Sequence, residues 1–153
     1  MKGITEAPFP PEWVVLSPDG IKNPRPTARA LNSQPPEGSH GKHVVLDFTG
    51  YAPPSPDDGG WMLEVMRAAV QRSGAREVHA HVERFDGTVS PPGFAAVVLL
   101  DESHVSAHCY SELGWLAIDC FTCGTTDPSG IADDITEALV KAMPDLVLRH
   151  RGI

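Results

Sequence analysis

The sequence is poor in positive charge. It has 12 Lys and Arg residues against 20 Asp and Glu, which gives a formal net charge of −8 at pH 7. Nucleic-acid binding depends on basic side chains that neutralise phosphates, and no basic patch is visible in the sequence. We therefore expect no nucleic-acid partner, and small cationic molecules remain compatible as ligands.

Long apolar runs are also missing. The sequence contains no run of 18 apolar residues and no charged segment leading into an apolar one. We therefore expect neither a membrane-spanning helix nor a secretory signal. The three cysteines are an odd number, which disfavours a framework of paired disulfides. Together these features predict a cytoplasmic protein with reduced thiols and no membrane partner.

Two common site patterns are absent as well. The sequence has no GxSxG segment, the mark of one large class of serine hydrolases. Cys120 and Cys123 form a single CxxC pair, whereas a four-ligand zinc site usually needs a second pair. The pair also lies in an apolar strand pattern and not at the helix start typical of thioredoxin-type sites. We therefore expect no metal site and disfavour a redox role.

The first 40 residues show no sustained helical or strand period. Eight of the 15 prolines fall before residue 37, and proline removes backbone donors and disfavours helix at the residue before it. We interpret residues 1–40 as a Pro-rich, disordered N-terminal extension and residues 41–153 as the folded domain.

The folded domain alternates between strand and helix patterns. Branched or alternating apolar residues predict strands at 43–48, 78–85, 94–100, 104–110, 115–122 and 146–148. Apolar residues at helical spacing predict one helix over 62–70, stopped by Ser73-Gly74, and a second from Asp127-Pro128 to Pro144. This order predicts an α+β two-layer sandwich, an antiparallel sheet with two helices on one face. The other face then needs polar residues or a partner copy.

Most of the chemically reactive side chains cluster in residues 99–124. Alternation along the strand at 104–110 places His104 and His108 on one face. Glu102, Ser103 and His104 are adjacent in sequence, but catalytic triads are assembled from separate loops. Adjacency is required, however, when a serine attacks the carbonyl of the residue before it.

The run ESHVSAHCYSELGWLAIDCFTCG, residues 102–124, resembles the prokaryotic S-adenosylmethionine decarboxylases, whose corresponding stretch reads like ESHxxIHTxPExGYAAxDxFTCG. Upstream, Gly41-Lys42-His43 followed by VVLDFTG resembles the opening strand of that family. The resemblance covers residues 41–149. It implies a pyruvoyl-dependent decarboxylase that acts on S-adenosylmethionine and supplies aminopropyl groups for spermidine biosynthesis.

The resemblance also implies a proenzyme that cleaves itself between Glu102 and Ser103. The Ser103 hydroxyl attacks the Glu102 carbonyl, and elimination and hydrolysis leave a pyruvoyl group as the cofactor. That group forms a Schiff base with the substrate amine and accepts electrons as carbon dioxide leaves. His108 matches the histidine that assists processing, and Cys123 matches the residue that protonates the substrate carbon. The family favours a homodimer of cleaved protomers, each comprising residues 1–102 and 103–153.

For the substrate, the resemblance implies three contacts. Glu112 matches the carboxylate that binds the ribose hydroxyls. Tyr110 and Phe85 match aromatic residues that stack on the adenine, and such rings also attract a cationic sulfonium.

The sequence departs from the family pattern at several positions. Ala95 stands where the family usually has a serine that helps processing, and Ser111 stands where proline is usual. Cys109 replaces a threonine, and the loop DGTVSPPG looks longer than typical. These departures leave two alternatives: a pyruvoyl-dependent ornithine or arginine decarboxylase, and a non-cleaving homologue that acts as a binding or regulatory subunit.

Overall fold

The computed structural model describes residues 41–101, 103–123 and 125–153. The expected N-terminal extension, residues 1–40, and Glu102 at the expected cleavage site therefore lie outside the described residues. The elements in chain order are β1 (Lys42–Thr49), α1 (Asp58–Ser73), β2 (Glu77–Phe85), β3 (Gly93–Leu100), β4 (His104–Tyr110), the short 3₁₀ helix η1 (Ser111–Leu113), β5 (Trp115–Thr122), α2 (Pro128–Ala142) and β6 (Val147–Gly152).

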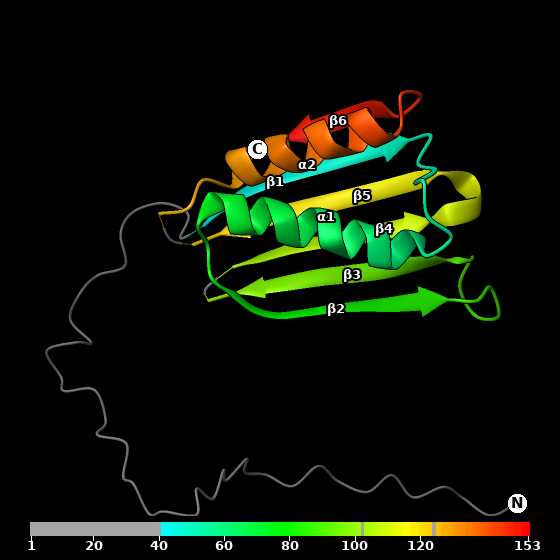
Figure 1. Cartoon of the computed structure of the whole chain (residues 1–153), viewed down its shortest axis with the longest axis horizontal. Coiled ribbons are helices and arrows are strands. Elements are labelled where there is room, and N and C mark those ends of the chain that lie inside the picture. The colour runs from blue at the N-terminus through cyan, green and yellow to red at the C-terminus, as the bar shows by residue number, and fades with distance from the viewer. Residues whose placement is uncertain (1–40, 102, 124) are drawn as a thin grey trace, which may run out of the picture. The chain divides into compact units, whose positions relative to one another are not determined.

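The strands form one sheet in the order β2-β3-β4-β5-β1-β6, and every neighbouring pair is antiparallel. Strands β2 to β5 are neighbours in the sheet in the same order as in the chain. Strand β1 instead pairs with β5 and β6, which come much later in the chain. Both helices cover the same face of the sheet (Figure 1). The predicted α+β two-layer sandwich is confirmed.

Helix α1 ends and helix α2 begins at the predicted signals, and an aspartate side chain caps the start of each helix. The Asp57 side chain accepts the N–H of Gly60 over 3.0 Å at the start of α1, which satisfies a free donor of the first turn. The helix ends at Gly74, whose φ of 76° is the left-handed conformation that favours glycine. Asp127 caps α2 in the same way, with proline in the first turn.

Alternation along the strands divides the sheet into two faces. One face packs under the helices: α1 contacts β2 and β3, and α2 contacts β1 and β5. We call the opposite side the open face. Its side chains alternate with the buried ones and come from all the central strands: His43, Val45, Asp47 and Thr49 of β1, Ala95, Val97 and Leu99 of β3, His104, Ser106, His108 and Tyr110 of β4, and Trp115, Ala117, Asp119 and Phe121 of β5.

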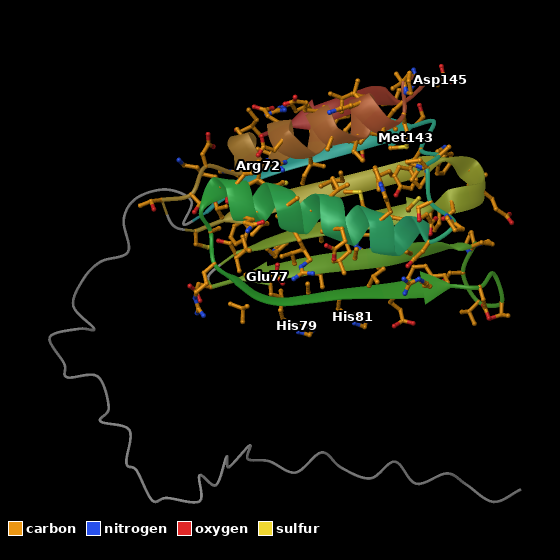
Figure 2. All side chains as sticks on the ribbon, viewed as in Figure 1. Arg72, Glu77, His79, His81, Met143 and Asp145 are labelled. Carbon is orange, nitrogen blue, oxygen red and sulfur yellow. The ribbon has the colours of Figure 1, made fainter. Side chains whose placement is uncertain are left out.

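The two edge strands differ from the sequence prediction. Strand β6 spans 147–152, whereas the sequence predicts 146–148. The prediction is too short because β6 pairs only with β1 and its side chains are mostly exposed, which leaves no apolar pattern to read. An edge strand of this kind needs no apolar alternation. On β2, which the sequence predicts from residue 78, Val78 is 55% exposed, since the register with β3 shifts between Glu77 and His79. Figure 2 shows His79 and His81 projecting from this edge strand.

Among the described residues, neither helix has the length and the apolar character needed to cross a membrane.

Candidate active site

Ser103 lies in a tight turn between β3 and β4. Leu99 and His104 are the last paired residues of the two strands, and the Leu100 N–H donates to the Ser103 carbonyl over 2.9 Å. Only Asp101 and residue 102 separate these two hydrogen-bonded residues. The two residues that flank positions 101 and 102, Leu100 and Ser103, are therefore held together by this hydrogen bond at the end of the β3–β4 pair.

Cys123 lies beside Ser103, at the end of the neighbouring strand β5. The backbone N–H of Cys123 donates to Ser103 Oγ over 3.1 Å. The Cys123 side chain is exposed, whereas the Cys120 side chain is buried in the core. Burial raises the pKa of Cys120 to about 12. The two cysteines of the CxxC pair thus have different environments, and only Cys123 is placed for chemistry near Ser103.

Three polar side chains form a chain of contacts on the open face next to this turn. His43 Nδ1 lies 3.2 Å from one oxygen of the Asp119 carboxylate, and His104 Nε2 lies 3.5 Å from the other. The ring of Phe121 packs against both imidazoles, at centroid distances of 4.4 and 5.4 Å. Sequence reasoning did not single out Asp119, because its contact with His43 spans 76 residues.

A cavity of about 620 Å³ opens near the other end of the central strands. Three predicted residues, Phe85, His108 and Tyr110, line it together. Trp115 also lines it, with its ring centroid 6.4 Å from that of Tyr110. Glu112 lies in η1, just beyond Tyr110, and is not part of the lining. The lining is mainly aromatic and apolar, which suits a flat ring of a ligand.

Two polar residues of this cavity were not found from the sequence. Arg149 of β6 lines the cavity and donates from Nε to Thr49 Oγ1 over 2.8 Å. Asp47 of β1 supplies a carboxylate to the same lining. Arg149 lies beyond the predicted end of its strand, so no pattern in the sequence pointed to it.

A half-buried polar cluster joins η1 to the start of α1. The Ser111 hydroxyl donates to the Asp58 carboxylate, and the Tyr51 hydroxyl donates to the Asp58 carbonyl over 3.1 Å. Burial raises the pKa of Tyr51 well above its usual value and the pKa of Cys109 to about 12. The departure from proline at position 111 therefore has a structural role, because the serine ties η1 to the start of α1.

The structure does not bring all predicted residues together in one protomer. Ser103 and Tyr110 are seven positions apart along the β4 direction, which corresponds to roughly 23 Å at the rise of a β-strand. The β3–β4 turn and the β4–β5 connection lie at opposite ends of the sheet (Figure 1). One protomer thus presents Ser103 and Cys123 at one end and the aromatic cavity near the other.

The chain is similar to one family along most of its folded part. The family model for S-adenosylmethionine decarboxylase matches residues 42–152. An S-adenosylmethionine decarboxylase proenzyme from Symbiobacterium thermophilum is 38% identical over 102 residues, covering 66% of this chain and 74% of the relative. A proenzyme of the same name from Methanococcus maripaludis is 32% identical over 114 residues, covering 74% of this chain and 90% of the relative. The crystal structure of the adenosylmethionine decarboxylase from Aquifex aeolicus matches with a TM-score of 0.50 and 28% identity, covering 74% of this chain and 91% of that one.

Proposed function

The chain belongs to the S-adenosylmethionine decarboxylase family and is an adenosylmethionine decarboxylase, and we propose that it is made as a proenzyme that cleaves itself between Glu102 and Ser103. The observation that supports this proposal is the contact between Ser103 Oγ and the Cys123 N–H at 3.1 Å. It holds the hydroxyl oxygen in place and leaves the hydroxyl proton free to be removed.

The cleavage needs no external reactant except water. Ser103 Oγ forms a bond to the carbonyl carbon of residue 102, the C–N bond breaks, and the Ser103 nitrogen keeps the proton that the hydroxyl gives up. Loss of the Ser103 α-proton then breaks the bond from Cβ to Oγ. This elimination releases the first fragment, which now ends in the main-chain α-carboxylate of Glu102. The Cys123 N–H donates to this same oxygen, so it stabilises the charge that develops there. Hydrolysis releases ammonia and leaves a pyruvoyl group.

The surroundings of Ser103 suit this cofactor. When present, the pyruvoyl group supplies the carbonyl that accepts electrons as carbon dioxide leaves. We propose Cys123 as the proton donor to the substrate carbon, because its thiol is exposed and belongs to the residue whose backbone N–H contacts Ser103. His108 lies five positions along β4 from Ser103 of its own protomer, roughly 16 Å, and is therefore proposed to assist processing at Ser103 of a second copy of the chain.

We propose a homodimer that pairs two open faces. Val45, Leu99, Tyr110 and Trp115 are large apolar side chains exposed on that face, and such a surface favours association. A two-fold axis across the strands places Ser103 and Cys123 of one protomer against the aromatic cavity of its partner. Each site then combines cleavage residues from one protomer with Phe85, His108 and Tyr110 of the partner subunit.

The aromatic cavity supports an adenosyl substrate over a basic amino acid. Phe85, Tyr110 and Trp115 offer ring faces to an adenine and to a cationic sulfonium. Within the described part of the chain, Asp47 is the one carboxylate of the lining. We propose that Glu112 contacts the ribose from the rim and that the decarboxylated product serves spermidine synthesis. A panel of S-adenosylmethionine, ornithine and arginine tests this choice through carbon dioxide release.

The intact mass of the purified protein under denaturing conditions tests the cleavage itself. Two fragments, residues 1–102 and residues 103–153 with a pyruvoyl mass at the second amino terminus, are the expected result. A single uncut chain that persists for days would overturn the proposal and favour the non-cleaving subunit.

A further inference from the structure

Arg76 lies in the short connection between α1 and β2. Figure 2 marks the two sides of this connection, Arg72 in the last turn of α1 and Glu77 at the start of β2. Arg76 Nε donates to Asp101 Oδ2 over 2.8 Å, and Arg76 Nη2 donates to the other carboxylate oxygen. This two-point contact fixes the position of a carboxylate better than a single hydrogen bond does.

Asp101 is the first residue of the turn that carries the expected cleavage bond. It directly follows β3, and Ser103 directly precedes β4. Ser103 is held twice, by its carbonyl contact with the Leu100 N–H and by the contact of its Oγ with the Cys123 N–H. The two residues on either side of position 102 are therefore both anchored, Asp101 by Arg76 and Ser103 by the sheet.

Anchoring on both sides matters for the chemistry of this bond. When Ser103 Oγ attacks the preceding carbonyl carbon, it closes a five-membered ring through Cβ, Cα and the amide nitrogen. The carbonyl must turn towards the hydroxyl, and rotation of the backbone before residue 102 would move it away. Restricting that rotation raises the fraction of molecules in a reactive geometry.

The ion pair is exposed, and it borders a cavity. The Arg76 and Asp101 side chains are 73% and 52% exposed, and an exposed pair contributes little to folding stability. A cavity of about 570 Å³ is lined by both residues and by Ser103. It gives water access to the cleavage turn, which the hydrolysis step requires. The position of the pair thus favours a role in processing over a role in folding.

We propose that Arg76 is a positioning residue for self-cleavage, which acts through Asp101 to hold the turn in a reactive geometry. This inference rests on the proposed function, because it concerns the step that produces the cofactor.

The test follows cleavage of freshly synthesised full-length chains over time by intact mass. Arg76→Ala and Asp101→Asn are each expected to slow cleavage by about two- to fivefold, the range that the strength of an exposed ion pair allows. The matched control is Arg72→Ala, which removes an Arg72 to Asp134 ion pair of 2.8 Å at the end of the same helix. This control is expected to cleave at the wild-type rate.

The exchanged pair, Arg76→Asp with Asp101→Arg, is expected to recover much of the lost rate, because it restores the ion pair with reversed charges. A purely structural role of Arg76 predicts a lowered melting temperature instead, so each variant is also melted. Cleavage of Arg76→Ala at the wild-type rate, or slow cleavage together with an unfolded chain in both Arg76→Ala and the exchanged pair, would overturn the inference while the proposed function stands. An uncut wild-type chain would overturn the proposed function itself.

Discussion

Ala95 of β3 and His108 of β4 are direct partners across the antiparallel pair and lie on the open face. On its other side, His108 faces Ala117 of β5. Both cross-strand neighbours end in a methyl group, so neither can hydrogen-bond to the His108 ring. The position where the family usually has a serine is therefore directly across from the histidine expected to assist processing.

Ala95→Ser is expected to speed self-cleavage several-fold. Paired residues on antiparallel strands have their Cβ atoms about 5 Å apart, so the new hydroxyl reaches the imidazole and orients it. The measurement is the half-time of cleavage by intact mass. In the background of His108→Ala, the serine is expected to give no acceleration, since it acts through the ring. An unchanged half-time in Ala95→Ser alone would contradict the prediction.

The three cysteines are expected to react differently with iodoacetamide. Burial disfavours the charged thiolate and raises the pKa values of Cys109 and Cys120 to about 12, so both stay protonated and unreactive at neutral and mildly alkaline pH. Native protein at pH 8 should therefore take up one label, on Cys123, as read by peptide mass. Unfolded protein should take up three. Rapid labelling of Cys120 in the native protein would contradict the burial.

Much of the fold was predictable from local pattern. The strand at 104–110 alternates between core and open face as predicted, because one buried face forces apolar residues to alternate. The end of α1 at Gly74 was predictable as well, since few residues other than glycine adopt its backbone conformation.

The contacts that build the site were less predictable. The meeting of His43 and Asp119 depends on the pairing of β1 with β5, which joins residues 76 positions apart. The hydrogen bond from Cys123 to Ser103 likewise joins the ends of two neighbouring strands, β5 and β4. Spacing along the chain carries no information on such pairing. The shared role of Ser103 and Cys123 was therefore expected only from the family resemblance.

Ser111→Ala is expected to lower the free energy of unfolding by about 1–3 kcal/mol, the usual cost of losing a hydrogen bond to a charged group. The variant removes the hydroxyl that donates to Asp58 and leaves that half-buried carboxylate with one fewer donor. Urea denaturation measures the change. The matched control is Thr88→Ala, which removes a hydroxyl bond to Asp86 in an exposed loop and should cost much less. Equal effects of the two variants would contradict the structural role of Ser111.

Mixed dimers distinguish a shared site from a site within one protomer. Ser103→Ala removes the source of the pyruvoyl group but keeps the aromatic cavity, and Tyr110→Ala alters the cavity but keeps Ser103 and Cys123. Each variant alone is expected to be nearly inactive. When they are unfolded together and refolded in equal amounts, half of the dimers are mixed and each holds one intact site.

The refolded mixture is therefore expected to recover about a quarter of the wild-type activity per chain. The recovery arises because the roughly 23 Å between Ser103 and Tyr110 within one protomer is too long for one substrate molecule to bridge. The control is a mixture of Ser103→Ala with Cys123→Ala: both changes lie at the same end of the sheet, so each protomer would lack part of the cleavage half-site and no activity should return. A mixture of Ser103→Ala and Tyr110→Ala that stays inactive, although mass spectrometry shows mixed dimers, would place the whole site within one protomer and contradict the pairing of open faces.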